Sequence, residues 1–110
     1  MYVIVWEFQV AAARAKDFER AYGPDGDWAR FFQRAPAFRG AELLRGTGDD
    51  AEPEAEASTG AFYWTVDRWD SREAYEDFNT RFEREYEELD TRLAELCEAE
   101  VCLGKFETVD

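Results

Sequence analysis

The stretch from Phe62 to Phe82 constrains the fold more than any other, because its hydrophobic period changes within two residues. Its first part, FYWTVDRW, is dense in aromatic and β-branched residues and alternates as a strand does. Its second part repeats apolar residues every three or four positions, as one face of a helix does. The change falls at Asp70 and Ser71. The sequence therefore predicts a strand over 61–69 that leads directly into a helix.

That helix carries the clearest periodic pattern in the chain. Its apolar and aromatic positions follow at intervals of three or four: Tyr75, Phe78, Phe82, Tyr86, Leu89, Leu93 and Leu96. Asp70 and Glu73 have the spacing of a capping box, and Ser71 competes with Asp70 as the N-cap. Asn79 and Thr80 weaken the helix, so we expect a kink or break between Thr80 and Glu83.

The other elements follow from the same two periods. They are strands at 2–10, 38–45 and 101–109, a helix at 11–22 and a short helix at 27–35. Gly40 is expected to mark a bulge or a close approach in its strand. Between the second and third strands, segment 46–60 is acidic and contains no aromatic or branched aliphatic residue, so we predict a mobile loop, either a solvated excursion or a lid.

This order of elements predicts an α+β fold. Four strands with two helical crossovers form the ferredoxin-like βαββαβ arrangement, an antiparallel sheet with its helices on one face, and residues 1–110 make one domain. The strands at 2–10 and 61–69 are apolar or aromatic on both faces. Because helices cover only one face, we expect the other to pack against a second copy of the chain.

The charge of the chain limits its partners. Twenty-six acidic and thirteen basic residues give a net charge of -13, which repels nucleic acid and anionic membrane surfaces. The same charge suits a solvated surface or a cationic partner. The apolar N-terminal run is too short for a signal peptide, so the expected location is cytoplasmic. Cys97 and Cys102 lack companion ligands, and no metal site is predicted.

Two carboxylates stand on strands among apolar neighbours, Glu7 and Asp67. Burial would raise the pKa of either group and make it a candidate general base. The alternative is an ion pair with Arg68 or Arg39, either within the fold or at a dimer interface.

Two motifs point to a family. The segments RWDSREAY (Arg68 to Tyr75) and YGPDGDW (Tyr22 to Trp28), with the order of elements, resemble the antibiotic biosynthesis monooxygenase group of dimeric α+β barrel proteins. The resemblance implies a ferredoxin-like protomer, a dimer joined sheet to sheet, and a pocket between sheet and helices. The family includes cofactor-independent oxygenases of aromatic polyketides and haem-degrading oxygenases.

The haem-degrading branch places a functional Trp where Trp69 stands, an Asn where Trp6 stands, and a haem-ligating His near Asn79. The present chain contains no His, which excludes haem ligation by imidazole. Haem degradation is therefore not expected, and no cofactor is predicted. In the cofactor-free branch, Asn, Trp and Tyr side chains polarise a phenolic substrate, and this chain supplies all three residue types.

We take two functional hypotheses from this. In the first, the chain is a monooxygenase without a cofactor that acts on a small aromatic metabolite. Its candidate catalytic residues are Trp69, Asn79 and Glu7, and its candidate pocket residues are Trp6, Trp64, Tyr75 and Phe78. In the second, the chain is a non-catalytic dimeric binding or scaffold module, and the aromatic residues only fill the core and the interface.

Overall fold

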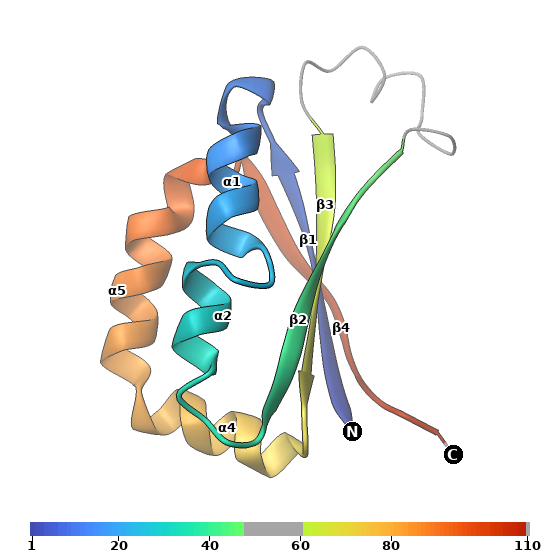
Figure 1. Cartoon of the computed structure of the whole chain (residues 1–110), viewed down its shortest axis with the longest axis vertical. Helices are drawn as coiled ribbons and strands as arrows, with labels where there is room; N and C mark the ends of the chain where they lie inside the picture. The colour runs from blue at the N-terminus through green and yellow to red at the C-terminus, as the bar shows by residue number, and fades with distance from the viewer. Residues whose placement is uncertain (48–60, 110) are drawn as a thin grey trace.

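The computed structural model describes residues 1–47 and 61–109 and shows one sheet with helices against one of its faces (Figure 1). The elements are β1 (Tyr2–Val10), η1 (Ala12–Arg14), α1 (Ala15–Tyr22), α2 (Asp27–Phe32), β2 (Phe38–Arg45), β3 (Ala61–Trp69), α4 (Arg72–Arg81), α5 (Glu83–Leu93), η2 (Ala94–Leu96) and β4 (Ala99–Glu107). From 48 to 60, the segment predicted as a mobile acidic loop lies outside the described residues.

The sheet has the order β2-β3-β1-β4, and all neighbouring strands are antiparallel. This topology confirms the ferredoxin-like α+β prediction. The pairing shifts by one residue between Phe38 and Gly40, and Gly40 has a φ of 114°, a left-handed conformation that a side chain disfavours. The predicted irregularity in this strand is therefore present at Gly40.

The strand-to-helix junction forms as expected, with one choice resolved. Ser71 is the N-cap of α4, and its Oγ accepts a hydrogen bond from the backbone nitrogen of Ala74 at 3.1 Å. Asp70 instead pairs with Arg39, whose Nη2 donates to Oδ2 at 2.9 Å. The predicted break is also confirmed, because α4 ends at Arg81 and α5 begins at Glu83.

Three predicted boundaries differ from the structure. The short helix, predicted over 27–35, ends at Phe32. The first helix, predicted over 11–22, begins at Ala15, because residues 12–14 form the separate 3-10 turn η1. The last strand, predicted over 101–109, runs from Ala99 to Glu107. It pairs with β1 from Gln9↔Ala99 to Tyr2↔Glu107, so the register with β1 decides where it begins and ends.

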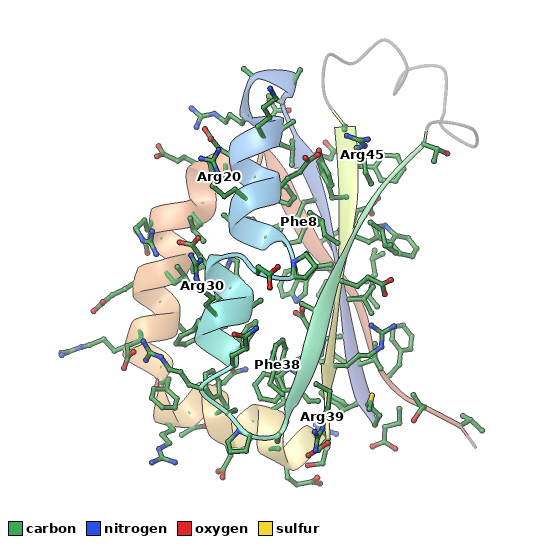
Figure 2. All side chains as sticks on the ribbon, viewed as in Figure 1. Phe8, Arg20, Arg30, Phe38, Arg39 and Arg45 are labelled. Carbon is green, nitrogen blue, oxygen red and sulfur yellow. The ribbon has the colours of Figure 1, made fainter. Side chains whose placement is uncertain are left out.

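The core lies between the sheet and the helices and is mainly aromatic (Figure 2). Its largest fully buried side chains are Trp69, Tyr63, Phe18, Ile4 and Val10. Aromatic contacts link Trp69 to Phe32 and Phe38 at ring-centroid distances of 5.5 and 5.2 Å. This core holds β3 against α2 and α4 and so fixes the walls of the space above the sheet.

The other face of the sheet is open and apolar. The large hydrophobic side chains exposed on it are Leu44, Trp64, Val101, Leu103 and Phe106. Trp64 is 41% exposed and Phe106 is 53% exposed, and no described element covers them. Across the described residues, the helices are all too short or too polar to span a membrane.

Candidate functional site

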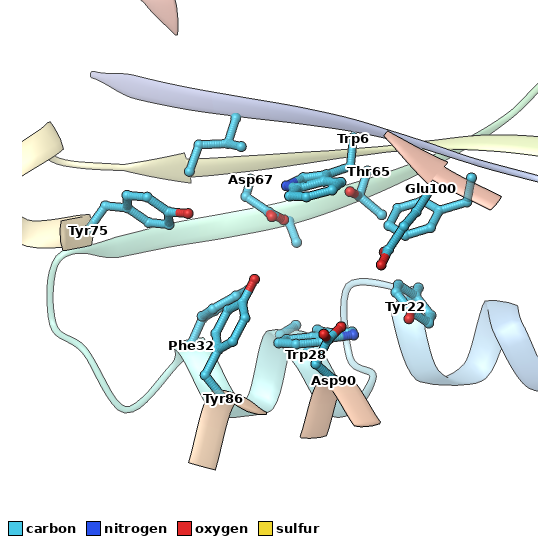
Figure 3. Close-up of a pocket in the computed structure, with 14 residues that line it drawn as sticks. Trp6, Tyr22, Trp28, Phe32, Thr65, Asp67, Tyr75, Tyr86, Asp90 and Glu100 are labelled. Carbon is cyan, nitrogen blue, oxygen red and sulfur yellow. The ribbon is translucent and has the colours of Figure 1, made fainter. Parts of the chain in front are cut away.

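A cavity of about 110 Å³ lies between the sheet and the helices (Figure 3). Its lining comes from both layers: Ile4, Trp6, Phe8, Tyr22, Trp28, Ala29, Phe32, Ala41, Thr65, Asp67, Tyr75, Tyr86, Asp90 and Glu100. Seven of these fourteen residues are aromatic. A concave, mostly aromatic site with a few polar groups has the composition of a small-molecule pocket.

Asp67 is the most perturbed acid in this cavity. It stands on β3 between Ile4 of β1 and Ala41 of β2, so neither cross-strand neighbour offers it a polar side chain. Its carboxyl points toward the helices (Figure 3). Among the described residues, no Lys or Arg forms an ion pair with it. Burial therefore raises the pKa of Asp67 to about 7.

Three phenols share the cavity with this acid. Burial raises the pKa of Tyr22, of Tyr75 and of Tyr86 above the ordinary value of a phenol, so all three remain protonated at neutral pH. The charge of Asp67 contributes to the raised pKa of both Tyr75 and Tyr86. The Tyr75 hydroxyl is oriented toward Asp67 (Figure 3). The cavity therefore combines one carboxylate with hydroxyl groups that donate hydrogen bonds.

Two further acids mark the other end of the cavity. Asp90 comes from α5, and Glu100 comes from β4 and lies exposed at the rim. Burial and the charge of Asp90 both raise the pKa of Glu100. Tyr22 and Trp28 lie beside them (Figure 3). The site is thus acidic at both ends, with aromatic walls between.

The residues predicted for the site fall into three groups. Trp6 and Tyr75 line the cavity. Trp69 and Phe78 belong to the adjoining core, where their ring centroids lie 5.4 Å apart, and neither reaches the cavity. Burial raises the pKa of Tyr75, and a hydrogen bond from Asn79 to its hydroxyl offsets part of that rise, while the Oδ1 of Asn79 is buried without a hydrogen-bond partner among the described residues. Asn79 therefore contacts Tyr75, which lines the cavity, but does not line the cavity itself.

Glu7 and Trp64 lie elsewhere. They face one another across β1 and β3 on the open side of the sheet, opposite the helices. Neither lines the cavity, so the predicted grouping of Glu7 with Tyr75 in one site does not form. The ion pairs expected within the fold for Glu7 or Asp67 are also absent among the described residues, whereas an ion pair at a dimer interface stays a prediction. Arg68 instead pairs with Glu42 at 3.3 Å, and Arg39 pairs with Asp70.

Several cavity residues were not singled out from the sequence. The sequence pattern places Tyr86 on the apolar stripe of its helix, and Asp90 lies four residues further along the same helix, a spacing that places both on one face. Glu100 had no such signal, because it fell before the predicted start of the last strand. Over residues 1–47 and 61–109, no cluster of three or more His, Cys, Asp or Glu is arranged to hold a metal ion.

The comparisons with known proteins agree with this architecture. SnoaB from Streptomyces nogalater, a cofactor-independent oxygenase, superposes with a TM-score of 0.65 at 22% identity, covering 99% of this chain and 93% of SnoaB. A SnoaB mutant in which one asparagine is replaced by alanine gives the same TM-score at 21% identity. HapK from Hahella chejuensis gives a TM-score of 0.63 at 18% identity over 99% of this chain and 93% of HapK. The chain has the fold of SnoaB and HapK. No family model and no curated protein sequence matches it.

Proposed function

We propose that the chain is an oxygenase that needs no cofactor and acts on a small phenol in the cavity between sheet and helices, with Asp67 as its general base. One observation carries the proposal: a carboxylate with a pKa of about 7 faces an aromatic cavity and has no basic partner among the described residues. The likeness to SnoaB, which is a cofactor-independent oxygenase, supports the reaction class.

The chemistry requires a base more than any other group. When no cofactor is bound, the substrate itself must supply the electrons that reduce dioxygen. Deprotonation of a phenol to its phenolate makes the ring electron-rich enough to react, and Asp67 accepts the phenolic proton in this first step.

The overall reaction balances without a further reductant. One phenol and one dioxygen give one quinone and one water. One oxygen atom becomes the new carbonyl oxygen on the ring, and the other leaves as water, whose two hydrogens come from the phenolic O–H and from the ring C–H that is replaced. The ring is oxidised because it gives up the electrons that reduce both oxygen atoms.

The size of the cavity restricts the substrate. A cavity of ~150 Å³ accommodates one benzene ring, so a partly open space of about 110 Å³ suits a single ring with a short substituent. The phenol donors Tyr75 and Tyr86 would hold the substrate oxygen near Asp67. We therefore expect monocyclic phenols to be better substrates than polycyclic ones.

The test is oxygen uptake with resorcinol, para-propylphenol and tyramine as substrates. We expect protein-dependent uptake and a quinone product that carries label from isotopic dioxygen. Asp67→Asn should lower kcat/KM by about 10² to 10⁴-fold, the usual contribution of a general base. In the wild type, kcat/KM should rise as pH increases through about 7, because only ionised Asp67 accepts a proton.

The matched control is Asp77→Asn, which removes an exposed carboxylate on α4 outside the cavity. It should retain wild-type kcat/KM. Equal loss in both variants would show that Asp67 acts through net charge or stability and would contradict its role as base.

The second candidate function is binding without catalysis. It is favoured by the burial of Trp69 and by the position of Asn79 behind Tyr75, because neither group reaches the cavity. Calorimetric binding of the three phenols, with oxygen uptake no faster than without protein, would select this function over the oxygenase.

A further inference from the structure

The charged side chains that line the cavity are all acidic. Asp67, Asp90 and Glu100 come from β3, α5 and β4, and no Lys or Arg is among the lining residues. None of the three acids forms an ion pair within the described part of the chain. The nearby cation Lys105 places its Nζ 5.7 Å from the ring centroid of Tyr75 and does not line the cavity.

The charge of one acid at this end of the cavity acts on the other. The charge of Asp90 raises the pKa of Glu100, and the charges of both acids contribute to the raised pKa of Tyr22. Like charges held close together, and partly removed from water, oppose ionisation of one another. A positive charge bound between them would remove this repulsion, whereas an anionic ligand would increase it.

The aromatic walls at this end suit a cation as well. Trp28 lies with its ring centroid 5.0 Å from Tyr86 and 6.3 Å from Tyr22, so three electron-rich rings adjoin the two acids. Ring faces attract ammonium groups, most strongly when water is excluded, and aromatic cages recognise organic cations in this way. At the inner end, the carboxyl of Asp67 also points into the cavity, and no Lys or Arg in the described part of the chain lines the cavity beside it.

We propose that the natural ligand is a phenol that carries an alkylamine, whose positively charged amino group binds between Asp90 and Glu100 against Trp28 and Tyr22, while its ring extends toward Asp67. This inference rests on the proposed function, since it uses the same cavity. It also solves a difficulty in that mechanism. Three acids would oppose the formation of a phenolate, and a cationic group on the same substrate offsets their field.

The test compares three phenols of matched shape and different charge: tyramine, which is cationic, para-propylphenol, which is neutral, and para-hydroxyphenylpropionate, which is anionic. Their dissociation constants are measured by isothermal titration calorimetry at low salt and about pH 8, above the pKa of about 7 of Asp67. We expect tyramine to bind about tenfold more tightly than para-propylphenol, within the range of cation–π and ion-pair effects. The anion should bind more weakly than either.

The double variant Asp90→Asn with Glu100→Gln should lower the affinity for tyramine at least about fivefold more than that for para-propylphenol, because only the cation loses its charge partners. Asp77→Asn, which removes an acid outside the cavity, should leave the order of the three ligands unchanged.

Failure of this inference differs from failure of the proposed function. Binding of para-propylphenol as tightly as tyramine by the wild type would overturn the cationic ligand and leave the phenol site intact. The wild-type comparison decides this point even if the double variant does not fold. If none of the three phenols binds, both the cationic alkylamine ligand and the phenol site are wrong.

Discussion

Asp67 shows how one side chain can link function to stability. In the unfolded chain it ionises near its ordinary pKa of 3.8, whereas burial raises its pKa to about 7 in the fold. Between these values the folded protein holds a proton that the unfolded chain has lost, so stability falls as pH rises through this window. The other titratable groups that line the cavity are Tyr22, Tyr75, Tyr86, Asp90 and Glu100, and none of them is basic.

We therefore expect Asp67→Asn to be more stable than the wild type at neutral to alkaline pH. The rise of the pKa of Asp67 from 3.8 to about 7 corresponds to at most ~4 kcal/mol of unfolding free energy, and the stability gained by the variant should be smaller. Urea midpoints of both proteins at about pH 5 and about pH 8 measure it, and the variant should show the smaller fall between them. An identical fall in the two proteins would mean that Asp67 is not desolvated. Asp77→Asn should behave as the wild type.

At the scale of elements, two adjacent residues stabilise the junction between β3 and α4 through different interactions. The Ser71 side chain caps the helix, while Asp70 reaches back to Arg39 at the start of β2. The backbone nitrogen of Asp70 donates to the carbonyl of Ala37 at 2.9 Å, which fixes the residue at the end of its strand. Both interactions position α4 and hence Tyr75 at the cavity.

Ser71→Ala should cost about 1 kcal/mol of unfolding free energy, the usual loss for an N-cap. Asp70→Ala should cost less, because it removes an exposed ion pair, which water and salt screen. Chemical denaturation of the two variants measures both losses. A larger loss from Asp70→Ala would show that Asp70, and not Ser71, supplies the cap.

The whole molecule has two unlike faces. Helices cover one face of the sheet, and the other presents Trp64, Val101, Leu103 and Phe106 to solvent. Exposed apolar patches of this kind mark interaction surfaces, and a second copy of the chain offers a matching one. We expect a homodimer joined through this face, as the family resemblance implies.

Light scattering at micromolar concentration tests the dimer. Trp64→Glu should shift the mass toward that of a monomer, because it buries a charge in the interface. Thr80→Glu adds the same charge on α4, on the other side of the molecule, and should leave the mass unchanged. A monomeric wild type would exclude this assembly at that concentration.

Local patterns in the sequence determined much of the fold. The change of period at Asp70 and Ser71 located a strand and a helix, Asn79 and Thr80 indicated the break near Phe82, and Gly40 indicated the irregular strand. Each depends on neighbours within a few residues. Such local preferences can be recognised without knowing where distant segments lie.

The composition of the cavity was decided only by the tertiary structure. Alternation along β3 placed Asp67 and Trp69 on one face, and the packing of α2 and α4 then covered Trp69 while leaving Asp67 at an open space. Glu7 has apolar neighbours in the sequence just as Asp67 does, yet β1 turns it to the face without helices. The abrupt change of hydrophobic period near Ser71 thus determined the strand β3 and the helix α4. Long-range packing decided that Asp67, and not Glu7, is removed from water against the helices.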